Sequence, residues 1–118
     1  MADAGLFIGF GHAVRGRERQ ALDVFKEATE YYARLQQQGE IDSFEPVFLE
    51  PHGGDLAGFF LVRGDQDRLA RIRISDEFRR LNMRATLITE DFGVVGAGLG
   101  EQIAAQLPIY NQQVEELT

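Results

Sequence analysis

Residues 9–18, "GFGHAVRGRE", combine three glycines and a histidine, a composition that could bind a phosphate. A phosphate-binding P-loop requires G-x-x-x-x-G-K-[ST], because its lysine contacts the phosphates and its hydroxyl binds magnesium. Gly11 and Gly16 have this spacing, but Arg17 and Glu18 occupy the positions of the lysine and the hydroxyl. A carboxylate there would repel phosphate, and the dinucleotide pattern G-x-G-x-x-G fails at its third glycine. We therefore interpret the glycines as a turn from strand to helix and predict no nucleotide site.

The two histidines are the remaining candidates for acid–base chemistry. His12 follows the first predicted strand, and His52 lies in the loop after the second. If these strands are parallel with one strand between them, the imidazoles start about 10 Å apart on one rim of the sheet. If the protein is an enzyme, we expect His12 to be the general acid or base, with Arg17 or Arg84 binding an anionic group. The alternative is that both histidines are ordinary exposed loop residues. The predicted ligand-binding residues are Gly9, Gly11 and His52.

No cofactor and no metal site is predicted. The chain has no cysteine, and its two histidines lack a close spacing such as H-x-x-x-H that would favour zinc. Ser43 lies within a predicted strand and Ser75 at a predicted helix start, and the sequence contains no other serine. Nucleophilic hydrolysis by a serine is therefore not expected.

The composition is typical of one globular domain over residues 1–118. The net charge of −7 argues against nucleic-acid binding, which requires a basic surface. Six arginines between residues 68 and 84 are mixed with acids, so this run is interpreted as a solvated helix face. The apolar runs are too short to span a membrane. The lack of cysteine and of a basic N-terminal segment leads us to expect a cytoplasmic protein.

Apolar residues spaced by three and four predict a long helix over residues 17–38. Gly39 follows it, as expected for the residue after a helix C-terminus. Tyr31 and Tyr32 are expected to pack on this helix with their hydroxyls at the surface. The predicted apolar stripe consists of Ala21, Phe25, Ala28, Tyr32 and Leu35.

Two shorter helices are predicted after Asp65 and Ser75, because each side chain can accept a hydrogen bond from the first turn of a helix. Alternating or continuous apolar runs predict four strands between and around the helices. A glycine-rich connection, residues 96–100, is expected to follow the last strand. The predicted strands cover residues 6–10, 41–50, 56–63 and 86–95.

A C-terminal tail over about residues 100–117 carries a second amphipathic pattern. Pro108 lies inside it and is expected to break or kink the helix, because proline removes a backbone donor. The four-stranded core does not require this tail. Its apolar stripe consists of Ile103, Leu107, Tyr110, Val114 and Leu117.

The order strand, helix, strand, strand, helix, strand predicts an α+β fold, the ferredoxin-like split βαβ arrangement, over about residues 5–96. Both long helices then cover one face of an antiparallel sheet. The other face still carries large apolar residues, either Phe7 or Leu6 with Ile8 and Phe10 on the first strand. A bare apolar face is unfavourable in water, so we predict a homodimer joined through the sheet faces. The alternative is that the C-terminal helix folds back over its own sheet.

At this level the chain resembles the dimeric α/β-barrel superfamily, whose members pair two ferredoxin-like sheets face to face. The resemblance spans residues 5–96 and rests on "LQQQGEIDSFEPVFL" after a long helix, "GFFLVRGDQDRLARI" before a second one, and "SDEFRRL" in that second helix. The superfamily includes cofactor-free monooxygenases of antibiotic biosynthesis and YCII-related proteins. The resemblance supplies no set of functional residues. The His–Asp pair of YCII-related proteins has no counterpart here, so their activity is not implied.

Two functions follow from these observations. The first is a small-molecule-binding or cofactor-free enzymatic domain, with a pocket between helices and sheet where Gly5, Gly9 and Gly11 leave space. The second is a non-catalytic structural or protein-interaction dimer that uses its C-terminal helix. A cavity of a few hundred Å³ beside His12 would favour the first.

Overall fold

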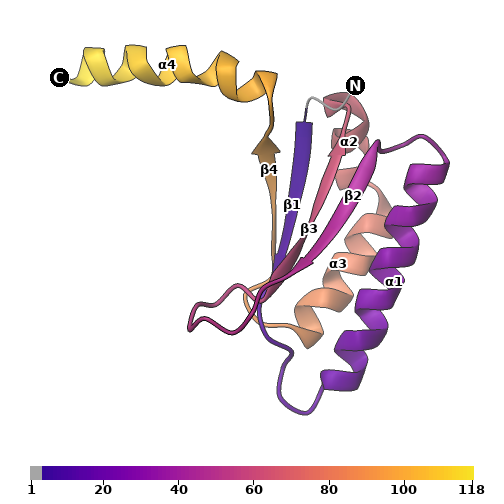
Figure 1. Ribbon diagram of the computed structural model, residues 1–118. Coiled ribbons are helices and arrows are strands. Elements are labelled where there is room, and N and C mark those ends of the chain that lie inside the picture. Colours follow the sequence, from indigo (N-terminus) through magenta and orange to yellow (C-terminus); the bar gives the residue numbers. More distant parts are fainter. Residues whose placement is uncertain (1–3) are drawn as a thin grey trace.

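The computed structural model describes residues 4–118 and contains one antiparallel sheet with four helices (Figure 1). The strand order is β2-β3-β1-β4, in which every neighbouring pair is antiparallel. This is the ferredoxin-like arrangement, so the predicted fold class is confirmed. The elements are β1 (Ala4–Phe10), α1 (Glu18–Gln37), β2 (Ser43–Phe48), β3 (Gly58–Gly64), α2 (Gln66–Arg73), α3 (Asp76–Ile88), β4 (Gly93–Gly98) and α4 (Glu101–Leu117).

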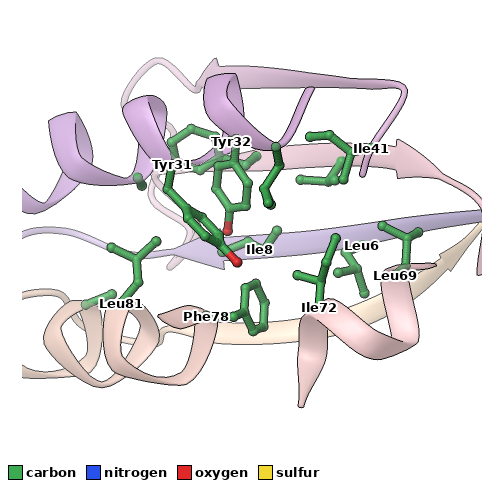
Figure 2. Close-up of a cluster of buried hydrophobic side chains, with 14 of the residues drawn as sticks. Leu6, Ile8, Tyr31, Tyr32, Ile41, Leu69, Ile72, Phe78 and Leu81 are labelled. Carbon is green, nitrogen blue, oxygen red and sulfur yellow. The ribbon is translucent and has the colours of Figure 1, made fainter. Parts of the chain in front are cut away.

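The hydrophobic core lies between the sheet and helices α1, α2 and α3, which cover the same face (Figure 1). Leu6 pairs with Val62 and Ile8 with Phe60, so these four side chains point to the helices. Tyr32 and Val62 are the most completely buried large side chains. Figure 2 shows Tyr31 and Tyr32 extending from α1 toward Ile8 on β1.

The predicted helix ends agree with the structure. Asp65 accepts a hydrogen bond from the Arg68 backbone N–H at 3.1 Å, and Ser75 accepts one from Phe78 at 3.4 Å. Gly39 follows α1 with a positive φ of 74°, where a side chain would be strained. These caps fix where α1 ends and where α2 and α3 begin.

The fourth strand begins later in the chain than predicted. Residues 86–88 continue α3, and β4 begins only at Gly93. The reason is packing: Leu81, Ala85 and Ile88 lie on one helical face and are all buried, which outweighs the strand propensity of Thr86. The glycine-rich segment expected to be a connection instead forms much of β4, an edge strand paired with β1.

The second face of the sheet carries a group of apolar side chains, and no helix in the described part of the chain lies over it. Phe7 and Phe59 lie there with ring centroids 4.9 Å apart, and Leu61 pairs with Phe7 across the strands. The structure thus selects Phe7 from the two alternatives on the first strand, and Phe59 and Leu61 of β3 lie on the same face. We call these three residues the open face.

Gly5 and Gly9 also belong to the second face, not to the core. A Cβ at Gly5 would lie 2.9 Å from the Leu99 side chain, and one at Gly9 would lie 2.6 Å from Phe7. The expectation that these glycines leave a pocket beneath the helices is therefore wrong. Alternation along β1 directs them to the opposite side.

Helix α4 extends away from the rest of the protein (Figure 1). It runs without a break through Pro108, and it buries none of its residues. The radius of gyration is 16.2 Å, against about 13.5 Å for a compact chain of this length. The alternative that this helix covers its own sheet is wrong. In the described part of the chain, no helix combines the length and apolarity that crossing a membrane requires.

Candidate functional site

A cavity of about 400 Å³ lies between the sheet and helices α1 and α3, at the end of the sheet where β1 finishes. Its deep walls come from Ile8, Phe60, Ala28, Leu81 and Ala85, all of which are buried. The volume falls within the range of small-molecule pockets. The cavity is thus large enough for a ligand and is surrounded mainly by apolar side chains.

Aromatic rings line one side of the cavity. The Phe25 ring lies 5.1 Å from that of Phe60 and 4.9 Å from that of Phe48, measured between centroids. Phe10 packs against the same rings at 6.2–6.3 Å. Rings in these orientations present flat faces and edges that suit a planar apolar ligand.

Space for the cavity comes from small residues on the helices. Ala21 and Ala28 alternate with Phe25 and Tyr32 along the inner face of α1, and Ala85 faces them from α3. The stripe that the sequence predicted is therefore present, but its alanines do not fill the space between helix and sheet. All five of these residues line the cavity.

His12 lies at the exposed mouth of the cavity, beside Glu18 and Leu22. Its backbone is held on both sides: the N–H of Gly11 donates to Glu90 O at 2.7 Å, and the N–H of Glu90 donates to His12 O at 2.9 Å. A Cβ at Gly11 would lie 2.5 Å from the Glu90 carbonyl oxygen, so glycine is required for this close approach. The imidazole therefore projects from a fixed backbone.

In the glycine turn before α1, a backbone N–H is already bonded to a carboxylate of this chain. The backbone N–H of Gly16 already donates to both carboxylate oxygens of Glu18, at 3.1 and 3.2 Å. Gly16 has a φ of 90°, which explains the glycine. The carboxylate thus takes the place that a bound phosphate would need.

Two polar side chains deeper in the site have no hydrogen-bond partner within residues 4–118. They are Tyr32, which is 1% exposed, and Asn82, which is half-buried on α3. Thr89, which also lines the cavity, already donates to Ala85 O at 2.7 Å. In the described chain no side-chain nitrogen or oxygen is both fully buried and unpaired, so the hydroxyl of Tyr32 and the amide of Asn82 border accessible space and are available to a ligand.

Burial raises the pKa of Tyr32 well above the ordinary phenol value of 10.0, and the neighbouring Tyr31 adds to the rise. Burial also raises the pKa of Tyr31, while the Ser75 hydroxyl opposes the shift. Both phenols therefore keep their protons at neutral pH and can donate hydrogen bonds. The expectation that their hydroxyls reach the surface is wrong, because the stripe of α1 faces the core.

The structure separates the other predicted site residues from the cavity. Arg84 lies on α3, where its Nε and Nη2 donate to the two carboxylate oxygens of Glu27 at 2.9 Å. It therefore does not precede a strand at the rim, as was expected. His52 bends over its own loop, with Nδ1 2.9 Å from Glu50 O, and does not line the cavity. Arg17 is exposed just before α1, also outside the lining, and Gly9 faces the other side of the sheet.

Sequence reasoning thus placed His12 and Gly11 at the cavity and missed Tyr32 and Asn82. A signal for Tyr32 existed, because a tyrosine in a stripe with two alanines has both a buried position and free space beside it. Asn82 lies one residue from the buried Leu81, and nothing in the local pattern distinguishes it from a solvated residue.

Comparisons with known proteins agree with this architecture. A dimeric ferredoxin-like protein of unknown function from Thermobifida fusca is 12% identical, with 84% of this chain and 93% of that chain covered and a TM-score of 0.63. One of the same description from Bacteroides fragilis is 12% identical, with 81% and 96% covered and a TM-score of 0.58. SnoaB, a cofactor-independent oxygenase from Streptomyces nogalater, is 15% identical, with 84% and 95% covered and a TM-score of 0.56.

No protein-family model and no curated protein matches the sequence. The structural likeness at these identities concerns the fold. By its sheet order and by these neighbours, the chain has a ferredoxin-like fold of the kind found in dimeric proteins and in a cofactor-independent oxygenase.

Proposed function

We propose that this protein binds a small, largely apolar molecule that carries a carbonyl or similar hydrogen-bond acceptor. The observation that carries the proposal is the 400 Å³ cavity with Tyr32 and Asn82 unpaired, among residues 4–118, in an otherwise apolar lining. Apolar walls supply affinity, and a few fixed polar groups orient the ligand. A strongly charged ligand is disfavoured, because no unpaired arginine or lysine lines the cavity in the described chain.

A cofactor-free enzymatic role is the second candidate. Two observations favour it: His12 stands at the mouth of the cavity, and SnoaB shares the fold. In this role His12 would exchange a proton with the exposed end of the ligand, while Tyr32 holds the ligand's oxygen at the inner end. Arg17 and Arg84 would take no direct part, because they lie outside the cavity.

The cavity itself can be tested by filling it. Ala21→Phe places a ring in the half-buried part of the lining, and Ala33→Phe places the same ring on α1 outside the cavity. A panel of small aromatic and alicyclic ketones is screened for a rise in melting temperature, since a ligand that binds the folded state stabilises it. We expect the panel to stabilise the wild type and Ala33→Phe but not Ala21→Phe. Equal stabilisation of all three proteins would place binding elsewhere.

We further propose that the protein acts as a homodimer joined through the open face. Three large apolar side chains lie on a sheet surface that no helix in residues 4–118 covers, and the dimeric neighbours share the fold. Burial of an apolar side chain stabilises by roughly 1.5–3 kcal/mol when it is complete. Identical faces favour a twofold pairing. This leaves the cavities on the outer sides of the two sheets, one in each protomer.

A further inference from the structure

We infer that α4 is an arm that docks on a second copy of this chain and contributes to the dimer. The inference rests on the proposed homodimer and goes beyond it, because a sheet-face dimer does not require α4.

The arm has an apolar stripe that is exposed to solvent in the single protomer. Every residue from Ile103 onward is exposed, and Leu107 and Tyr110 are 60% and 70% exposed. A 17-residue helix with an internal proline is marginal on its own, because little besides packing stabilises a short helix. The spacing of four and three over Ile103, Leu107, Tyr110, Val114 and Leu117 is that of a packing seam.

The direction and length of α4 favour a second copy as the occupant. The helix leaves the end of β4 on the opposite side of the strands from α1 and α3 (Figure 1). Its 17 residues span about 25 Å, at about 1.5 Å per residue. A second sheet packed on the open face would lie about 10 Å away, so the arm would pass its edge and reach its helix layer.

Charge complementarity indicates where on the second copy the arm ends. Residues 91–118 contain four acids and no lysine or arginine, and Glu115 and Glu116 lie at the far end of α4. The α2–α3 corner carries Arg71, Arg73, Arg79 and Arg80, none of which forms an ion pair within residues 4–118. The acids at the same corner are Asp76 and Glu77, and Glu77 already pairs with Arg34, so the corner keeps an excess of positive charge. Ile74 lies at that corner and is 64% exposed. An acidic, apolar arm therefore fits a basic corner with an exposed isoleucine.

The test compares lysines on two sides of α4. Leu107→Lys with Tyr110→Lys alters the stripe, and Ala105→Lys with Gln112→Lys adds the same charge on the opposite side of the helix. Because all four residues are exposed in the protomer, both variants should fold normally. Sedimentation measurements should show a dimer dissociation constant raised on the order of 100-fold for the stripe variant and within a few-fold for the control. Ile74→Lys should weaken the dimer in the same direction.

The outcomes separate the two proposals. A wild-type chain that is monomeric at micromolar concentration would overturn both the homodimer and the arm. A stripe variant that dimerises as tightly as the wild type would overturn the arm and leave the sheet-face dimer intact. A weakened stripe variant with an unaffected Ile74→Lys would overturn the docking of the arm at the α2–α3 corner.

Discussion

Tyr32 is the side chain on which the proposed site depends most. Its ring packs in the core, 5.2 Å from the Phe60 centroid, while its hydroxyl has no partner within residues 4–118. Tyr32→Phe removes only that hydroxyl. We expect affinity for a ketone ligand to fall by about 2- to 12-fold, the usual net effect of one hydrogen bond, with the melting temperature unchanged or slightly higher.

Calorimetric titration of Tyr32→Phe with a ketone and with its methylene analogue gives the measurement. Tyr31→Phe is the control, because Tyr31 is also buried but does not line the cavity. The methylene analogue should bind the wild type and Tyr32→Phe alike. A loss of affinity for both compounds would show that the hydroxyl acts on packing and not on the carbonyl.

The buried tyrosines also predict how stability changes with pH. Above about pH 10.0, phenols of the unfolded chain lose protons that Tyr31 and Tyr32 retain in the folded chain. This stabilises the unfolded state, so the free energy of unfolding falls with rising pH, by at most about 1.4 kcal/mol per unit for each tyrosine. Below pH 10.0 both residues are neutral in both states and contribute no slope.

Urea denaturation between pH 9 and 11 measures this slope. Tyr32→Phe should lose one tyrosine's share of it. Identical slopes for the wild type and Tyr32→Phe would mean that the phenol of Tyr32 is not held neutral by burial.

His12 is the predicted catalytic residue that the structure places at the cavity. Its side chain is exposed, so His12→Ala should leave the melting temperature nearly unchanged. Ligand affinity should fall by about 2- to 12-fold if the imidazole bonds the ligand, and any turnover should be abolished. His52→Ala, in a loop outside the cavity, serves as the control. Unaltered binding and turnover in His12→Ala would remove His12 from the site.

At the scale of elements, the mouth of the cavity depends on the contact between the segment after β1 and the segment after α3. Gly11→Ala would force a Cβ against the backbone oxygens of Glu90 and Asp55, at 2.5 and 2.9 Å. Backbone cannot move aside cheaply, so we expect a loss of about 1–3 kcal/mol in the free energy of unfolding. Gly93→Ala meets no atom within 4 Å and should be neutral within about 0.5 kcal/mol. Urea denaturation compares the two, and equal stabilities would contradict the close approach.

The elements themselves were largely predictable, because local chemistry determines them. The stripe of α1, the caps Asp65 and Ser75 and the turn at Gly39 each have a mechanism that the sequence displays. The segment after Leu81 was not predictable in this way. Whether Thr86 belongs to a helix or a strand is decided by the burial of Ala85 and Ile88 against the sheet, which is a tertiary contact.

The site was less predictable than the fold. His12 could be placed at a rim because strand order determines which loops share it. To predict the cavity, one must know which face of the sheet each β1 side chain points to. Neighbouring residues of a strand point to opposite faces, so Gly9 lies on the other side of the sheet from the cavity. Arg84 was misplaced for a similar reason. Because α3 is longer than predicted, Arg84 lies within this helix and pairs with Glu27 on the outer surface.

At the scale of the whole molecule, the sheet has two unlike faces. One is closed by helices that enclose the cavity, and the other presents Phe7, Phe59 and Leu61 without a helix over them. The central claim is that a second copy of the chain covers this open face. Leu61→Lys would place a charge in that interface, and Leu87→Lys would place the same charge on the outside of α3, where Leu87 is 67% exposed.

Light scattering at micromolar concentration tests this claim most directly. We expect a wild-type mass about twice 13.2 kDa, the same mass for Leu87→Lys, and a shift toward the single-chain mass for Leu61→Lys. A wild-type mass near 13.2 kDa would contradict it.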